Sequence, residues 1–204
     1  MQRHLPRNGR LSSSKDSIRR AAAELFAEKG FAATSTREIC ERAGITKPVL
    51  YYHFGSKEEL YEALVQDCFS EYQRELRRAA RRGRTTREKL LDVLLAMFSF
   101  SRRNHYEYRM AVRMVMAPEK ESPDIDLIEM SRADERLVRE IFREGIRNRE
   151  VHGNPRQIAE AICGIAFSMT MGYLLRRDPP LNRSDARRLV NLLLDGCGRK
   201  ATDR

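Results

Sequence analysis

Cysteines are few in this sequence, and they lack the spacings that bind metal. The four, at positions 40, 68, 163 and 197, are far apart and form no CxxC pair. Because zinc sites usually take their ligands from closely spaced pairs, we expect no metal and no cofactor. Three of the four lie in apolar helical patterns, which indicate buried free thiols and fit a reducing cytoplasm.

Long hydrophobic runs are missing as well. The N-terminal residues are polar and basic, so they do not have the pattern of a signal peptide. The longest uncharged run, Ala161–Leu175, has fifteen residues, whereas a membrane-spanning helix needs about 20. We expect a soluble, cytoplasmic protein in which this run forms a buried or interface helix.

The familiar catalytic motifs do not occur either. The histidines, at positions 4, 53, 105 and 152, form no HExxH pair, and the chain contains no GxSxG motif, P-loop or dinucleotide-binding fingerprint. The sequence therefore predicts that the protein is not an enzyme. A catalytic site assembled only in the folded chain is the alternative, and turnover assays would detect it.

Signals for β-strands are almost absent, while signals for helix starts recur. The segments that begin at Ser35, Ser56 and Thr85 read S/T-x-x-E, the capping box that satisfies free amides at a helix N-terminus. Asn154–Pro155 and Ser184–Asp185 indicate further starts. The pattern predicts an all-α protein of about nine helices, at approximately 14–29, 36–43, 47–53, 57–81, 87–103, 105–117, 124–150, 155–177 and 185–197.

Positive charge exceeds negative charge by ten, from 39 basic and 29 acidic residues. Such an excess favours polyanionic partners such as nucleic acid, although many basic proteins bind none. The run from Arg74 to Arg87 holds seven arginines and one glutamate. We interpret it as a solvated helix face, with nonspecific attraction of phosphates as the alternative.

The segment Ile45–Lys57 concentrates aromatic rings directly after a proline. As a helix it would turn Leu50 and Phe54 toward the core and leave the two adjacent tyrosines on the surface. A turn at Gly44 would join it to the preceding short helix, because glycine takes positive φ at little cost. Two short helices joined in this way and braced by a first helix make a helix-turn-helix, whose second helix reads the major groove.

These residues resemble the DNA-binding domain of TetR-type transcriptional regulators. The resemblance rests on Thr36-Arg37-Glu38-Ile39, Ala43-Gly44-Ile45, Leu50-Tyr51-Tyr52-His53-Phe54 and Ser56-Lys57-Glu58-Glu59-Leu60, in this order and spacing. Outside residues 14–65 only the helical architecture is similar. The resemblance implies an N-terminal arm and helix-turn-helix domain over residues 1–55, and a ligand-binding and dimerisation domain over residues 56–204.

The resemblance also implies which residues bind double-stranded DNA. Contacts to phosphates are expected from Ser35 or Thr36, Tyr52, His53 and Lys57, and contacts at or near base edges from Arg37, Thr46 (the N-cap), Lys47, Pro48, Val49 and Tyr51. Two alternatives stay open, because His53 could only cap or pack and Pro48 could only start its helix. The tail arginines Arg3, Arg7 and Arg10 could enter a minor groove, or the tail could be solvated and disordered.

For the C-terminal half, the resemblance implies a homodimer and a small-molecule effector. The expected interface is formed by the last two long helices, with Ala161–Phe167 and Leu189–Leu194; a purely intramolecular core is the alternative. Methionine and aromatic side chains adapt to apolar ligands, although such a stripe equally fits a plain core. The candidate ligand-binding residues are Phe98, Tyr106, Met110, Met114, Phe167 and Met171.

We therefore expect a sequence-specific DNA-binding regulator. Its simplest form is a dimeric repressor that a small, largely apolar effector releases from a palindromic operator. The alternative is a DNA-binding scaffold controlled by a protein partner without a small-molecule ligand, which a C-terminal half without a cavity would favour.

Overall fold

The computed structural model describes residues 13–176, 179 and 181–196. These residues form nine helices and no strand: α1 (Ser14–Lys29), α2 (Thr36–Ala43), α3 (Lys47–Phe54), α4 (Lys57–Ala80), α5 (Thr86–Arg103), α6 (His105–Met116), α7 (Leu127–Arg147), α8 (Pro155–Arg176) and α9 (Arg183–Asp195). The all-α prediction is confirmed, with every expected helix boundary within three residues of the observed one. The arginines of the N-terminal tail and Cys197 lie outside the described residues.

Side-chain caps fix most of these helix starts, as the sequence predicts. Complete capping boxes precede α2, from Ser35, and α5, from Thr85. The start of α9 differs from the prediction, because Asn182 rather than Ser184 is the N-cap and accepts the amides of Ser184 and Asp185. An asparagine carbonyl two residues earlier reaches these amides directly, so the helix begins two residues sooner than expected.

The described residues form two compact units that interleave along the chain. Unit 1 contains the residues up to Gln66 together with Arg109–Ile125, and unit 2 contains Asp67–Tyr108 and the residues from Asp126 onward. Helices α4 and α6 therefore each contribute to both units. This division differs from the expected boundary at residue 56, because the second part of α6 and the segment after it belong with the N-terminal helices.

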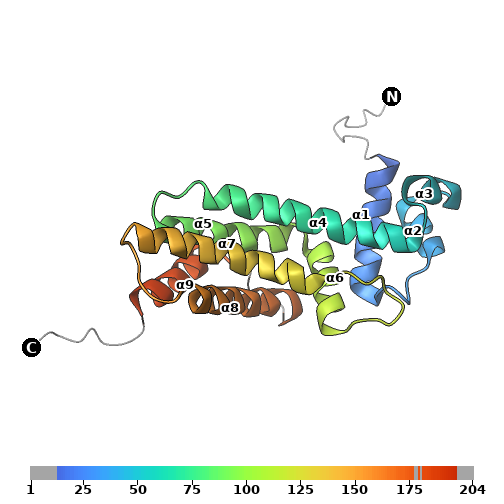
Figure 1. Ribbon diagram of the computed structural model, residues 1–204. Coiled ribbons are helices and arrows are strands. Elements are labelled where there is room, and N and C mark those ends of the chain that lie inside the picture. Colours follow the sequence, from blue (N-terminus) through green and yellow to red (C-terminus); the bar gives the residue numbers. More distant parts are fainter. Residues whose placement is uncertain (1–12, 177–178, 180, 197–204) are drawn as a thin grey trace, which may run out of the picture. The chain divides into compact units, whose positions relative to one another are not determined.

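Unit 1 is built on α1, α2 and α3, each of which packs against the other two (Figure 1). Its core contains three rings in mutual contact: the ring centroid of Phe26 lies 5.9 Å from that of Phe31 and 4.9 Å from that of Tyr61. Phe31 and Tyr61 meet edge to face at 5.0 Å. This aromatic cluster holds the loop after α1 against the start of α4, and so fixes the base on which α2 and α3 rest.

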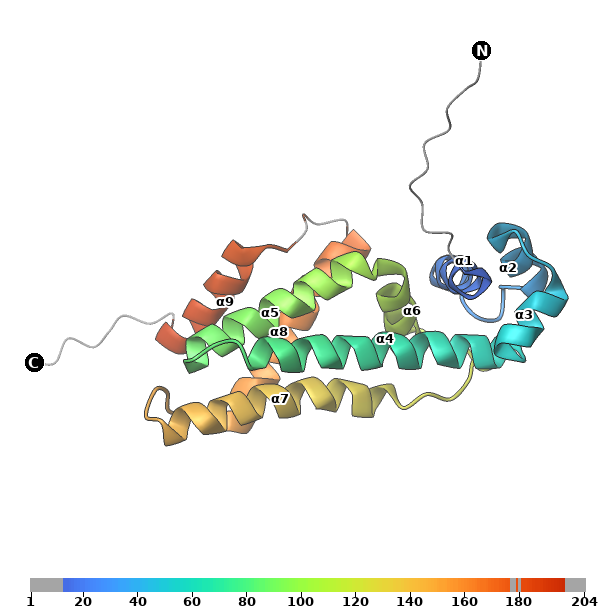
Figure 2. The ribbon, with the colours of Figure 1, turned by 90° about the horizontal axis from the view of Figure 1, so that it is seen from above.

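In unit 2, α5 is the central helix and packs against α7, α8 and α9 (Figures 1 and 2). The core of this unit includes Leu76 of α4, Phe100 of α5, Phe142 of α7 and Ile162 of α8, all nearly free of solvent contact. The described part of this unit contains no strand, so the apolar stripes on the facing sides of the helices hold the unit together.

Candidate nucleic-acid interface

The turn between α2 and α3 has the geometry that the sequence predicts. Gly44 takes the left-handed conformation, with φ +68° and ψ 35°. Its amide donates to the carbonyl oxygens of Cys40 and Glu41, and the amide of Ile45 donates to Cys40 at 3.0 Å. A side chain at position 44 would have space but would strain the backbone, so glycine suits this position for its conformation alone.

Helix α3 buries one side and exposes the other. Leu50 and Phe54 are buried in unit 1, whereas Tyr51 is 45% exposed and Tyr52 is 85% exposed. Both outcomes confirm the helical-wheel prediction. Thr46 is the N-cap residue, as expected, but its side chain accepts no capping hydrogen bond. The hydroxyl of Thr46 is therefore available to another partner.

The eleven residues predicted to bind DNA all lie in unit 1, and none of them is buried. They occupy the start of α2, the turn before α3, α3 itself and the start of α4. Ser35, Arg37, Thr46, Lys47, Pro48, Tyr51 and Tyr52 are exposed, and Thr36, Val49, His53 and Lys57 are half-buried. These eleven residues together form one surface of unit 1, which we call the α2–α3 surface.

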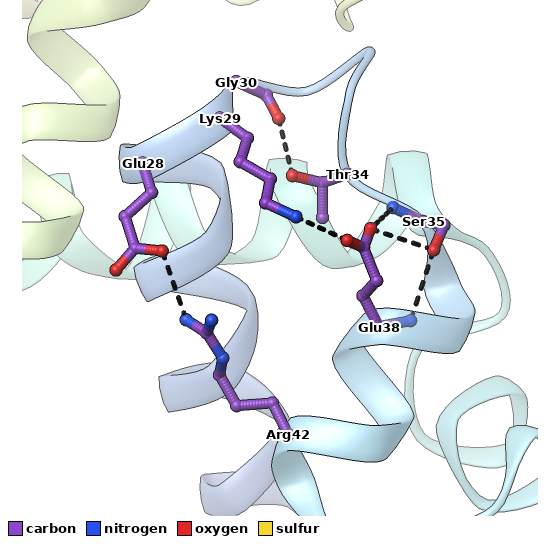
Figure 3. Close-up of polar contacts among 7 residues, drawn as sticks. All are labelled: Glu28, Lys29, Gly30, Thr34, Ser35, Glu38 and Arg42. Carbon is purple, nitrogen blue, oxygen red and sulfur yellow. Dashed lines mark hydrogen bonds and ion pairs between the residues drawn. The ribbon is translucent and has the colours of Figure 1, made fainter.

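Ion pairs and hydrogen bonds at both ends of α2 hold it against α1 (Figure 3). At its start, Glu38 accepts hydrogen bonds from the amide and hydroxyl of Ser35, each at 3.0 Å, and from the ammonium of Lys29 at 2.5 Å. The hydrogen bond from Lys29, followed by those from Ser35, lowers the pKa of Glu38 to about 2. At its end, Arg42 pairs with Glu28 at 3.4 Å. These contacts fix the orientation of α2 relative to α1.

Lys57, a predicted phosphate contact, already has partners inside unit 1. Its ammonium donates to the carbonyl oxygens of Phe31 and Thr34, both at 3.1 Å, and lies 4.0 Å from the centroid of the Phe31 ring. An ammonium has three N–H donors, so one donor is left after these two hydrogen bonds. Lys57 therefore holds the loop between α1 and α2, and its phosphate contact stays a prediction.

A contact that the sequence did not suggest ties the same loop to the segment after α6. The carboxylate of Glu119 accepts the backbone amides of Phe31, at 3.2 Å, and Ala32, at 2.7 Å. Arg113 donates to Glu119 at 3.3 Å and to the carbonyl oxygen of Lys29 at 3.2 Å. Glu119 and Arg113 are more than 80 positions from the residues that they contact at the end of α1 and in the loop after it. No local motif could therefore have revealed this contact, which we call the Glu119 clasp.

The six candidate ligand-binding residues are divided between the two units. Met110 and Met114 lie one helical turn apart on α6 and are buried in unit 1. Phe98 is buried in unit 2, where Tyr106 and Met171 are half-buried. Phe167 is 40% exposed. Their common role in ligand binding stays a prediction.

A buried polar cluster in unit 2 was not anticipated. The Tyr72 hydroxyl donates to Asp134 at 2.8 Å and the Gln73 amide donates to Asp134 at 2.7 Å, so both carboxylate oxygens are occupied. Burial raises the pKa of Asp134 to about 6, against the effect of these two donors. The side-chain oxygen of Gln73 is buried and has no hydrogen-bond partner among the residues that the structure describes. Tyr108 borders the cluster, with its ring 6.3 Å from that of Tyr72.

Helix α8 buries one face in unit 2 and exposes a second apolar face. Ala159, Ile162 and Ala166 are buried. On the other face, Phe167 is 40% exposed and Leu175 is 60% exposed. By length and composition alone α8 could also cross a membrane, and no other helix of the described residues meets that test. Its packing against α5, α7 and α9 identifies it instead as a core helix with a second, uncovered face.

The glycine turn of unit 1, with a second helix that presents lysine and tyrosine to solvent, defines the helix-turn-helix class of DNA-binding folds. The sequence model of the bacterial regulatory proteins of the tetR family matches residues 18–64. The helix-turn-helix segment of this chain is therefore similar to the DNA-binding segment of the tetR family.

Two curated relatives from Mycolicibacterium smegmatis match part of the chain. The HTH-type transcriptional activator FasR is 39% identical over 90 residues, which are 44% of this chain and 41% of FasR. The HTH-type transcriptional repressor KstR2 is 31% identical over 144 residues, which are 66% of each chain. The matched segments thus span less than two thirds of both relatives.

The similarity of fold extends further than that of sequence. The structure of the transcriptional regulator FadR from Bacillus subtilis, in complex with stearoyl-CoA, has a TM-score of 0.71 with this chain at 21% identity. It covers 89% of this chain and 98% of FadR. The two chains therefore share a fold through both the N-terminal and the C-terminal helices.

Proposed function

We propose that this protein is a cytoplasmic, sequence-specific DNA-binding regulator, and that its usual state on DNA is that of a dimeric repressor. The observation that carries the proposal is the α2–α3 surface. Rings as large as Tyr51 and Tyr52 remain exposed on a helix whose other side is fully packed. The lysine and tyrosines offer donors and rigid contact area to phosphates and base edges, and a helix N-terminus adds partial positive charge.

A second copy of the chain is the partner that fits the outer face of α8. One eight-residue recognition helix gives little affinity and specificity by itself, so two-fold dimers read palindromic sites. Phe167 and Leu175 on α8 and Leu192 on α9, which is 47% exposed, supply apolar area. Gly164 has open space around its α-carbon, which allows a partner helix to approach closely. Two helices from each subunit would form a four-helix bundle.

A small, largely apolar effector fits the C-terminal helices. The relative of similar fold was solved with stearoyl-CoA, which combines a long apolar chain with a polar head. Phe98, Tyr106 and Met171 in unit 2 offer adaptable apolar contacts. The unpartnered oxygen of Gln73 beside Asp134 offers one polar anchor. Release of DNA requires little energy, since a coupling of about 1.4 kcal/mol weakens binding tenfold.

Selection of DNA from a random duplex library, repeated at several salt concentrations, tests the proposal. We expect an enriched palindrome with half-sites roughly one helical turn, about 34 Å, apart. Binding without sequence enrichment, which disappears steeply as salt is raised, would contradict it, because net positive charge alone gives that result. The enriched duplex then serves as the probe for effector screening.

A further inference from the structure

Unit 2 contains a groove of about 690 Å³ outside the surfaces described above. The second half of α4, the middle and end of α5, and the residues at the start of α9 line it. Its volume falls within the range of small-molecule sites, roughly 300–1,000 Å³. Of the six candidate ligand-binding residues, only Phe98 lines it.

The groove is rich in positive charge. Five arginines and two carboxylates line it, a net charge of +3. One arginine is neutralised, because Arg103 donates to both carboxylate oxygens of Glu75 at 2.7 Å. The other four arginines form no ion pair among the described residues. They are Arg78 of α4, Arg82 of the turn after α4, Arg102 of α5 and Arg183 of α9.

Apolar side chains line the same groove. Leu95 and Phe98 come from α5, Ala79 from α4, and Leu181 from the segment before α9. Phe98 and Ala79 are buried, and Leu95 and Leu181 are half-buried. A groove of this composition suits a ligand with an anionic group and an adjoining apolar group. A purely inorganic anion would leave the apolar walls without a partner.

We infer that this groove binds a phosphate ester of an apolar group. A phosphate ester carries up to two negative charges and three acceptor oxygens, which match several guanidinium groups at once. Guanidinium forks bind phosphate through paired, charge-assisted hydrogen bonds that are stronger than neutral ones. A carboxylate, with one charge and two oxygens, would satisfy fewer of the arginines. The inference does not depend on DNA binding or on dimer formation.

Calorimetric titration of the full chain at fixed low salt tests this assignment with three probes. Octyl phosphate carries both the charge and the apolar chain, inorganic phosphate carries only the charge, and octyl glucoside carries only the chain. We expect octyl phosphate to bind at least about tenfold more tightly than either of the other two, since only it engages both walls of the groove.

A matched pair of variants locates the site. Arg77 and Arg78 are adjacent, exposed residues of α4, but only Arg78 lines the groove. We expect Arg78→Gln to weaken octyl phosphate binding about tenfold and the double variant Arg78→Gln/Arg102→Gln to weaken it further, whereas Arg77→Gln changes it less than twofold. Because all three positions are exposed, we expect the thermal unfolding midpoint of each variant to equal that of the wild type. An unchanged midpoint excludes misfolding as the cause of weaker binding.

Three outcomes would overturn the assignment. Equal weakening by Arg77→Gln and Arg78→Gln would mean that overall charge, and not the groove, attracts the probe. Binding that survives Arg78→Gln/Arg102→Gln would place the probe elsewhere. Inorganic phosphate that binds as tightly as octyl phosphate would exclude a role for the apolar wall.

Discussion

Helices α3 and α8 both leave large side chains in solvent, but the side chains differ in kind. On α3 the exposed rings are tyrosines, with lysine and threonine beside them at the helix start. On α8 the exposed large side chains are a phenylalanine and a leucine, and the small residues Ala161 and Gly164 are exposed on the same helix. Exposed hydroxyls and ammonium groups suit a polar, negatively charged partner, whereas exposed hydrocarbon suits another apolar surface.

The chemistry of an exposed side chain, and not its exposure alone, indicates which kind of partner can cover it. An exposed tyrosine keeps a hydrogen bond to water and costs little until a partner replaces that water. An exposed phenylalanine gains about 25 cal/mol for every Å² that a partner covers. The comparison therefore supports the proposal that α3 contacts DNA and the proposal that α8 contacts a second subunit, and each proposal can be tested separately.

The largest expected effect comes from placing a charge on the outer face of α8. Phe167→Glu would bury one unpaired carboxylate from each subunit at a two-fold interface. We therefore expect the dissociation constant of the dimer to rise by at least about 1,000-fold. Sedimentation velocity across a dilution series measures it. Arg143→Glu, which adds the same carboxylate at an exposed position of α7, is the control. A dimer that withstands Phe167→Glu would exclude α8 as the interface.

Substitution of Gly164 tests the proposed α8 interface in a second way. Because nothing lies within 4 Å of a side-chain carbon built on Gly164, a leucine fits the isolated subunit. It should also stabilise the helix by a few tenths of a kcal/mol or more, since glycine is a poor helix former. In the dimer the same leucine would block close approach of the helices. We therefore expect the dissociation constant of the dimer to rise about 100-fold. A Gly164→Leu protein that is more stable and still fully dimeric would contradict the close approach.

The comparison extends to two kinds of carboxylate: in unit 1, Glu38 pairs with Lys29 at the surface, whereas in unit 2 Asp134 is buried and accepts hydrogen bonds from the neutral side chains of Tyr72 and Gln73. The pKa of Asp134 is about 6, above its ordinary value of 3.8. The folded state therefore binds this proton more tightly than the unfolded chain, and its contribution to stability is largest below pH 4 and lost as pH rises through 6. We expect a contribution of about 3 kcal/mol.

Urea unfolding at several pH values between 4 and 7 measures this contribution, as the difference between the wild type and Asp134→Asn. Taking the difference removes the titration of other acids, including Glu38, whose lowered pKa acts in the opposite direction. Parallel pH profiles for the two proteins would contradict the raised pKa of Asp134.

Alanine substitutions on α3 test the proposed contact of this helix with DNA. Lys47→Ala and Tyr51→Ala should each weaken binding to the selected operator about tenfold, and the lysine change should also reduce the dependence on salt. Fluorescence anisotropy at constant ionic strength measures both. Arg81→Ala removes the same charge from unit 2 and should change affinity less than twofold. Full operator affinity in a folded Tyr51→Ala protein would exclude the proposed docking of α3.

The smallest effect separates two lysines of the α2–α3 surface. Lys57→Met loses two hydrogen bonds to carbonyl oxygens and a contact with the Phe31 ring, so we expect it to lower the free energy of unfolding by about 1 kcal/mol. Lys47→Met, at an exposed position, should leave stability unchanged. Urea unfolding compares them. Equal stability of the two variants would show that Lys57 does not hold the loop between α1 and α2.

Local signals predicted most of the fold. Capping boxes, glycine stops and apolar stripes act within a few residues of one another, so the helix boundaries and the exposed tyrosines of α3 followed from the sequence. Contacts between distant segments did not. Glu119 gave no sign that it would meet the amides of Phe31 and Ala32, and Arg78 and Arg82 belonged to a run interpreted as a solvated face.

The sequence contained one sign of the buried polar cluster, but it did not identify the partners of Asp134. Asp134 lies four residues before Val138 and seven before Ile141, on the buried face of α7, so an acid in the core could have been suspected. Its partners on α4 could not, because the sequence does not say which faces of two helices meet.

The Glu119 clasp has a consequence for how this protein can be divided. A fragment that ends at Gln66 would carry the whole helix-turn-helix but would lack the carboxylate that accepts the amides of Phe31 and Ala32, and the arginine that meets the end of α1. The compact N-terminal unit is thus continuous in space but not in the gene. A chimaera that moves this DNA-binding unit onto another regulator has to carry residues 109–125 with it, or find another acceptor for that loop.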